Sequence, residues 1–306
     1  MGVFFGLAIF LFGLAFGSFL NVCIHRIPRR ESIVFPGSAC PKCKSAIRAY
    51  DNIPLASWLI LRGRCRQCRT PISPRYPAVE LLLGLLWLAC YAQFGLSLGT
   101  LKYCVFSFLV VALIFIDAEW KLLPDALTLP GLLLGILFSL IVPVHDLLMR
   151  FVPSMLRLSQ GWHAPWRLLS LADSLLGAAV GASFIYGVGV IYLHARGVEG
   201  MGLGDVKLMA MVGAFLGVKL TVATIFAASL VGSLFGLWTI LFVWLKRTRR
   251  RMERNHEQAA VARRRAWQSA RMIYRYYQIP FGVFLGSMAI ASLFFGNSVW
   301  HWYFEL

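Results

Sequence analysis

Long uninterrupted apolar runs dominate the pattern of this chain. Residues 3–23 carry no charge, and six further runs follow, at residues 81–99, 103–116, 126–144, 174–193, 208–245 and 279–299. About 20 apolar residues make one membrane-spanning helix, so the run at 208–245 is too long for a single span. Lys219 interrupts that run beside Gly217, which predicts a hairpin of two helices with an unusually short first arm. The pattern therefore indicates an all-α polytopic membrane protein with about eight transmembrane helices.

The composition supports this class. Hydrophobic residues make up 59% of the 306 positions and charged residues only 14%, whereas soluble domains carry about 25% charged residues. Thirty Lys and Arg against thirteen Asp and Glu give a net charge of +17. On a soluble chain this charge would suggest nucleic-acid binding. On a membrane chain, the positions of the charges must be considered first.

The basic residues gather on one side of the predicted membrane. Eleven lie within residues 26–75 and eleven within residues 246–275, and Lys121, Arg196 and Lys207 bring that side to 25 of the 30. The positive-inside rule places this side in the cytoplasm and both termini outside, so topology explains the charge without nucleic acid. No basic segment precedes the first run, so we expect an uncleaved helix there rather than a signal peptide.

The same distribution of charge predicts that the chain is divided into three parts. Residues 1–24 form the first transmembrane helix, residues 25–78 a cytoplasmic loop, and residues 79–306 a seven-helix membrane domain with a basic cytoplasmic insertion at 246–278. Within the insertion, residues 246–275 include eleven basic and two acidic residues. This composition suits a helix lying on anionic lipid headgroups, and the alternative is a solvated charged loop.

Four of the seven cysteines form two Cys-x-x-Cys pairs in the cytoplasmic loop, with 21 residues between the pairs. Each pair lets two thiolates reach one ion across a tight turn, and two pairs close a tetrahedral site without an open position. Such a site makes Zn²⁺ structural rather than catalytic. Two disulfides are the alternative, but thiols on a cytoplasmic face stay reduced. The expected ligands of this zinc-ribbon-like module are Cys40, Cys43, Cys65 and Cys68.

Two carboxylates stand at the edges of the apolar runs. A charged acid at membrane depth costs roughly 2.5–3.5 kcal/mol on insertion scales, so each one needs an explanation. Asp117 follows Ile116 at the end of one run, and Asp205 follows Gly204 just before another. The predicted topology places both at the cytoplasmic ends of helices, at one depth. Two adjacent carboxylates share a proton, as in aspartic proteases, so one activates water while the other donates to the scissile carbonyl.

Structural roles are the alternatives for these two acids, namely a helix N-cap for Asp205 and a marker of the membrane interface for Asp117. Other hydrolytic signatures are missing from the sequence. His256 and Glu257 are followed by Ala260 where a zinc protease carries its second histidine, and no Gly-x-Ser-x-Gly elbow occurs.

Three neighbouring acids have interpretations of their own. Asp125 precedes an apolar run and is typical of an N-cap, and Glu119 is typical of a solvated acid. Glu80, at the start of the second run, either pairs with Arg75 or faces the site.

A series of short motifs runs along the chain in order. They are Gly17-Ser18-Phe19-Leu20-Asn21-Val22 with His25-Arg26, Cys40-Pro41-Lys42-Cys43, Asp51-Asn52-Ile53-Pro54, Gly63-Arg64-Cys65-Arg66-Gln67-Cys68, Tyr76-Pro77 with Glu80, Leu123-Pro124-Asp125, the segment from Gly202 to Lys207, and Ile279-Pro280-Phe281-Gly282. In these motifs the sequence resembles the type IV prepilin peptidases, which are bifunctional leader peptidases and N-methyltransferases of pilus and type II secretion systems. The resemblance covers nearly the whole chain.

The resemblance implies residue roles and an activity. The family's catalytic aspartates fall on Asp117 and Asp205, and its zinc-type cysteines fall on the four cysteines named above. The implied substrates are prepilins or pseudopilins, whose short basic leader ends in Gly before a hydrophobic helix. Cleavage after that Gly would occur at the cytoplasmic face of the bacterial inner membrane. Methylation of the new amino terminus by S-adenosylmethionine would follow, although no residue of the sequence can be assigned to that cofactor.

Two departures from the family pattern stand out. Val283 occupies the position where the family usually has a proline, which predicts a less rigid start of the last helix. The Arg-rich stretch at 246–275 is also longer than expected. Two other functions stay open at this stage: a GxGD intramembrane aspartic protease of broader specificity, and a non-enzymatic secretion-system scaffold that bears zinc.

Overall fold

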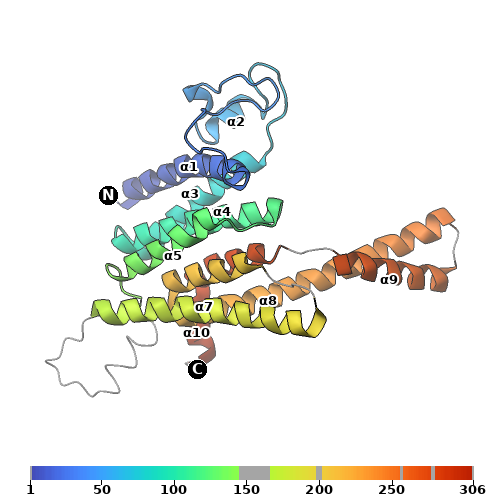
Figure 1. The fold of residues 1–306 in the computed structure, drawn as a ribbon. Helices are drawn as coiled ribbons and strands as arrows, with labels where there is room; N and C mark the ends of the chain where they lie inside the picture. The colour runs from blue at the N-terminus through green and yellow to red at the C-terminus, as the bar shows by residue number, and fades with distance from the viewer. Residues whose placement is uncertain (1, 145–165, 198–201, 256–257, 277–279, 305–306) are drawn as a thin grey trace.

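The computed structural model describes residues 2–144, 166–197, 202–255, 258–276 and 280–304. This part of the chain is helical and contains no strand, as the sequence predicts. The long helices have the following bounds: α1 Gly2–Arg26, α3 Arg75–Phe94, α4 Leu98–Trp120, α5 Asp125–Ser139, α7 Trp166–Arg196, α8 Leu203–Asn255, α9 Ala259–Tyr276 and α10 Phe281–Phe304. Figure 1 shows them as a layered bundle with a small irregular module beside the ends of α1 and α3.

Six helices among the described residues are long and apolar enough to cross a membrane, namely α1, α3, α4, α7, α8 and α10. The apolar helix α5 is shorter, with 15 residues. The chain is therefore a multi-pass membrane protein. The predicted number of eight spans would count α5 and both arms of α8, and it stays a prediction.

Helix α8 contains the reversal that the sequence predicts. Gly217 has φ 80° and ψ −179°, a conformation that needs glycine, and it separates two helical arms. In the second arm, Leu220 packs against Gly296 near the end of α10, and Gly232 packs against Phe284 near the start of α10. The second arm therefore runs antiparallel to α10. The hairpin at Gly217 is confirmed.

Helix α4 lies at the centre of the bundle and packs against α1, α3, α5 and α10. Its residues Phe106, Val110 and Leu113 are fully buried or nearly so. Phe106 lies 5.1 Å, between ring centroids, from Phe215 of the first arm of α8. The burial of α4 fixes the position of its last turn, where Asp117 lies.

Helices α1 and α3 approach each other closely at their ends next to the module. A Cβ on Gly17 would lie 2.6 Å from the Cα of Glu80, so only glycine allows this approach. Two 3-10 turns, η1 Ile27–Arg29 and η2 Ala49–Asp51, and the short helix α2 Ala56–Ile60 occupy the segment between α1 and α3. This segment carries the four cysteines and is called the cysteine module below.

The basic insertion forms a helical arm. The second half of α8 continues to Asn255, and α9 packs back against it, as Figure 1 shows on the right. Trp244 Nε1 of α8 donates to the carbonyl of Arg263 of α9 at 3.1 Å, and the rings of Trp244 and Trp267 meet edge to face. Residues 246–275 are therefore largely helical.

Candidate functional site

Asp117 lies in the last turn of α4 and is 6% exposed. The helix ends at Trp120 because Lys121 adopts the left-handed conformation, and its N–H donates to the carbonyl of Asp117 at 2.9 Å. Asp205 lies in the first turn of α8 and is half-buried. The two carboxyl groups are close enough to interact electrostatically. The structure thus brings together two acids that are 88 positions apart in the sequence.

The start of α10 supports the Asp117 carboxylate. The N–H of Val283 donates to Asp117 Oδ2 at 3.0 Å. A proline at this position would have no N–H to donate, so the departure at Val283 supplies a hydrogen bond. Gly282 lies so close that a Cβ there would sit 2.8 Å from Asp117 Oδ2. The residue types at the start of α10 therefore fit the carboxylate closely.

Leu123 fills the space between the helix starts that flank the two acids. It is 8% exposed, and it packs against Gly204 of α8 and Gly282 of α10. The pair of acids is thus assembled from three helix ends that meet around one apolar side chain. In proteins, two carboxyl groups that lie close together can share a proton, and such a pair can activate water and protonate a carbonyl.

Two of the nearby acids form ion pairs. Asp125 is the first residue of α5, where Pro124 is the N-cap, and the Asp125 side chain pairs with Lys207 Nζ at 2.6 Å. The expected N-cap role of Asp125 is therefore wrong, because the side chain faces α8 instead. Glu119 pairs with Arg75 at 2.7 Å, so it is not simply solvated. This pair ties the start of α3 to the end of α4.

Because Arg75 pairs with Glu119, it does not pair with Glu80. The Glu80 carboxylate accepts a hydrogen bond from Leu55 N at 2.8 Å and is 8% exposed. It faces the cysteine module rather than the two aspartates.

The four expected zinc ligands lie together. The Sγ atoms of Cys40, Cys43, Cys65 and Cys68 all lie within 4.8 Å of one another. Those of Cys40 and Cys68 are 3.7 Å apart. Thiolates at about 2.3 Å from a tetrahedral Zn²⁺ are about 3.8 Å apart, so the cluster fits this ion.

Each Cys-x-x-Cys pair forms the same turn. Lys44 N donates to the carbonyl of Cys40 at 2.9 Å, and Arg69 N donates to that of Cys65 at 3.1 Å. Lys44 and Arg69 both have positive φ. The hydroxyl of Thr70 lies 3.3 Å from Cys68 Sγ, and its hydrogen bond lowers the pKa of Cys68 to about 6. A thiol with this pKa is a thiolate at neutral pH, the form that binds metal.

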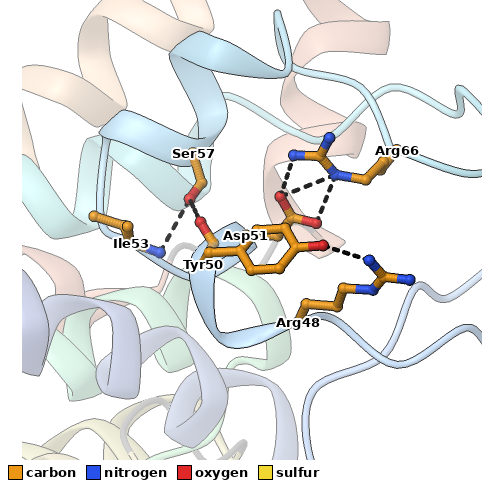
Figure 2. Close-up of polar contacts among 6 residues, drawn as sticks. All are labelled: Arg48, Tyr50, Asp51, Ile53, Ser57 and Arg66. Carbon is orange, nitrogen blue, oxygen red and sulfur yellow. Dashed lines mark hydrogen bonds and ion pairs between the residues drawn. The ribbon is translucent and has the colours of Figure 1, made fainter.

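A further group of hydrogen bonds stabilises the conformation of the cysteine module (Figure 2). The Arg66 guanidinium makes three hydrogen bonds to the Asp51 carboxylate, at 2.5, 2.8 and 3.1 Å, and holds the pKa of that acid below its usual range. Arg48 donates to the hydroxyl of Tyr50 at 2.5 Å. Ser57 donates to the carbonyl of Tyr50 and accepts from the N–H of Ile53, each at 3.0 Å.

These contacts surround a cavity of about 600 Å³ between α1, the module and the start of α3, which Glu80 and Asp51 both line. Sequence reasoning missed this cavity, because its walls come from three separate segments. The only signal was the position of Asp51 and Glu80 within the ordered motifs.

The comparisons with known proteins match most of the chain. Residues 11–94 match the family model of the bacterial peptidase A24 N-terminal domain, and residues 104–237 match that of the type IV leader peptidase family. No solved structure matches the chain.

Three curated relatives all carry the name prepilin leader peptidase/N-methyltransferase. The relative from Aeromonas hydrophila is 35% identical and covers 96% of this chain and 92% of its own length. That from Myxococcus xanthus is 38% identical over 78% of this chain and 64% of its own length. That from Neisseria gonorrhoeae is 36% identical over 72% of this chain and 77% of its own length. The chain therefore belongs to the type IV leader peptidase family.

Proposed function

We propose that this protein removes the basic leader from type IV prepilins or type II secretion pseudopilins and then N-methylates the new amino terminus. The family membership and the shared name of the relatives support both activities. They do not favour a broader GxGD protease or a non-enzymatic scaffold. The observation that carries the proposal is the pair of carboxylates at the helix ends, in a chain of this family.

Asp117 and Asp205 are the proposed catalytic residues. In the shared-proton state, the ionised acid takes a proton from water, and the protonated acid donates to the carbonyl oxygen of the scissile peptide. The N–H of Val283 orients the Asp117 carboxylate.

The proposed location is the bacterial inner membrane, with the active site and the cysteine module on the cytoplasmic side and both termini in the periplasm. The two segments richest in basic residues, 26–75 and 246–275, support this orientation. The hydrophobic helix of the substrate would lie among the spans and its leader in the cytosol. Interaction with anionic lipid is part of the same proposal, and nucleic acid is not.

The proposed division of the chain follows from this orientation. Residues 1–24 would be the first transmembrane helix, residues 25–78 the cytoplasmic loop with one structural Zn²⁺ on its four cysteines, and residues 79–306 the membrane peptidase domain with its insertion at 246–278. The Sγ separations in the module support the metal. The S-adenosylmethionine used for methylation would supply an electrophilic methyl group.

The test uses purified full-length protein, a synthetic prepilin and S-adenosylmethionine with a labelled methyl group. Loss of the leader and label on the product are scored separately. The parent should do both, and Asp117→Asn and Asp205→Asn should each lose cleavage, because an amide keeps the shape of the acid but cannot share its proton. Near-parental cleavage by both variants would show that the dyad assignment is wrong.

A further inference from the structure

A basic arm lies outside both the aspartate pair and the cysteine module. It consists of residues 246–255 of α8 together with α9, and Figure 1 shows it extending past the ends of α4 and α7. Glu253 pairs with Arg249 at 2.7 Å, and the described part of the arm holds no other acid. A surface of this charge attracts an anionic partner. Its exposed basic side chains include Lys246, Arg249, Arg250, Arg263, Arg264 and Arg271.

The two helices of the basic arm are joined into one body. Ala262 and Ala266 of α9 are fully buried, and α9 packs against α8. Trp244 Nε1 of α8 donates to the carbonyl of Arg263 at 3.1 Å, and the ring centroids of Trp244 and Trp267 are 6.2 Å apart. The small apolar positions of α9 are therefore used against α8, while its arginines stay exposed. Helix α9 thus contributes charge to the surface of the arm.

The stretch of α8 just before the basic arm exposes apolar side chains. Leu237, Trp238 and Leu241 are 65%, 60% and 49% exposed, in a helix that is long and apolar enough to cross a membrane. On such a helix, exposed apolar side chains contact the acyl chains of the lipid. The acyl chains therefore reach along α8 as far as the base of the arm.

Two tryptophans mark the level at which the acyl chains end. Trp244 comes just before the first basic residue of the arm, Lys246, and its hydrogen bond to the carbonyl of Arg263 places α9 at the same level. Trp267 lies against Trp244 there. Tryptophan is enriched at the boundary between acyl chains and headgroups. The basic residues at this level on both helices therefore face phospholipid headgroups, and anionic headgroups complement their charge.

The basic arm is joined to the start of α10 in two ways. Four residues separate the end of α9 at Tyr276 from the start of α10 at Phe281. On α8, the ring of Phe235 lies 5.4 Å, between centroids, from that of Phe284, and Gly232 packs against the same Phe284 ring. A displacement of the arm is therefore passed to the first turn of α10.

The first turn of α10 contacts Asp117. The N–H of Val283 donates to Asp117 Oδ2 at 3.0 Å, and Gly282 lies against the same oxygen. Twelve residues, about 18 Å, separate Gly232 from Trp244 along α8. The basic arm thus links the headgroup level of the membrane to a hydrogen bond on a proposed catalytic residue.

We propose that anionic headgroups of the cytoplasmic leaflet bind the basic arm and thereby hold the first turn of α10 on Asp117, so that anionic lipid regulates leader cleavage. This inference rests on the proposed function, and it names the surface and the contacts through which lipid acts. In the structure, the arm lies at the headgroup level while the first turn of α10 is seated on Asp117. Lipid that binds the arm in this position favours the seated state by the difference in its affinity for the two states.

Binding of lipid is tested first, on the parent protein and without substrate. The protein is placed in phosphatidylcholine vesicles that contain phosphatidylglycerol with a photoreactive headgroup, irradiated and digested, and the labelled peptides are mapped. Label on residues 246–271 that excess unlabelled phosphatidylglycerol removes supports the proposal. Label confined to residues 26–75 overturns it. Removal of the label by soluble glycerol phosphate also overturns it, because the arm would then bind free anions rather than a lipid surface.

The other occupant of the arm is a second copy of the chain. An amine-reactive cross-linker added to the same vesicles tests this through Lys246. Links between the arms of two copies, in place of lipid label, would show that another chain covers the arm and would overturn the proposal.

Charge variants test whether the bound lipid acts on cleavage. The stimulation is the ratio of kcat for leader cleavage in vesicles with phosphatidylglycerol to kcat in phosphatidylcholine alone. Arg263→Gln combined with Arg264→Gln should lower the stimulation at least threefold and leave kcat in neutral vesicles within twofold of the parental value. The control combines Arg62→Gln with Arg64→Gln in the cysteine module, where both side chains are also exposed, and should keep the parental stimulation. Parental stimulation in the arm variant, or an equal loss in the control, overturns the proposal.

The link to α10 is tested by a variant that leaves every charge of the arm in place. Phe235→Ala removes the ring contact with Phe284, so it should lower the stimulation at least threefold while the lipid label on the arm is retained. Phe226→Ala is the matched control on α8, since it removes a ring contact with Phe184 at 6.5 Å, and it should keep the parental stimulation. Parental stimulation by Phe235→Ala overturns the link.

The label and the rates separate this inference from the proposed function. If the arm is labelled but the parent cleaves no prepilin in any vesicle, the proposed function fails and the lipid surface stands. If the parent cleaves and methylates at equal rates in neutral and anionic vesicles, the regulation fails and the proposed function stands.

Discussion

Gly282→Ala is a sharp test of the fit around Asp117. The new Cβ would lie 2.8 Å from Asp117 Oδ2 and 3.1 Å from Leu123 Cδ1, whereas ordinary contacts begin at 3.4 Å. The carboxylate must therefore move by about 0.6 Å, because its Oδ2 is the atom nearest to the new Cβ. A side-chain end moves at little cost in stability, so we expect a loss of about 1 kcal/mol or less in the free energy of unfolding.

Catalysis should respond much more strongly than stability. A displacement approaching 1 Å at a reacting group can cost about 100-fold in rate, equivalent to about 2.7 kcal/mol in the activation free energy. The assay is leader cleavage of a synthetic prepilin followed by gel shift, beside a thermal unfolding curve of each variant. We expect kcat to fall about 100-fold with a small change in Tm.

Gly296→Ala is the matched control on the same helix. Its Cβ would meet Leu220 Cδ2 at 2.6 Å, far from the aspartates. It perturbs the packing of α10 to a similar degree without touching a carboxylate, so cleavage should stay within about threefold of the parental rate. Equal losses in the two variants, or near-parental cleavage by Gly282→Ala, would refute the reasoning.

Four further outcomes are expected. Asp125→Asn should reduce stability and cleavage only slightly, because its pair with Lys207 is exposed and such pairs contribute about 0–1 kcal/mol; a loss of cleavage beyond tenfold would contradict this. Cys65→Ser should lower zinc content and make the module sensitive to protease, and elemental analysis that finds no zinc in active parent enzyme would exclude the metal. Cleavage should be faster in vesicles with anionic lipid, and deletion of residues 249–265 should reduce the difference, whereas identical rates in neutral and anionic vesicles would remove the lipid role. Methylation should follow cleavage, since the accepting amine does not exist earlier, and a methylated uncleaved precursor would overturn this order.

The apolar runs predict where the helices lie but not where they end. The run at 103–116 becomes a helix from Leu98 to Trp120, because Ser97 caps its start by accepting from Thr100 N, and Lys121 stops it in the left-handed conformation. The run at 81–99 likewise begins at Arg75 as a helix. The start of α3 and both ends of α4 therefore lie outside the apolar runs, whereas α3 ends at Phe94, before its run does.

The reversal in α8 was predictable because its cause is local. A 38-residue apolar run is too long for one span, and Gly217 is the residue that tolerates the required conformation. The cysteine cluster was predictable for the same reason, since each Cys-x-x-Cys turn is set by four consecutive residues. Residues that are close together in the sequence determine both features, so both can be predicted without the tertiary fold.

Partners distant in sequence were not predictable. Asp125 and Lys207 are 82 positions apart, and Arg75 and Glu119 are 44 apart. Whether an acid at a helix end caps that helix or reaches a cation on another depends on how the helices pack. The interpretation of Asp125 as a cap failed on this point.

The two aspartates and the cavity differ in how they depend on the cysteine module. The aspartates are positioned by α4 and α8, and α10 packs against both without the module. The cavity takes part of its wall from the module itself, including Trp58 and the backbone around Leu55. Loss of the metal should therefore distort the cavity before it impairs cleavage. The Arg75–Glu119 pair is one of the contacts that hold the first turn of α3 to the end of α4, so it connects the wall of the cavity to the helix that carries Asp117.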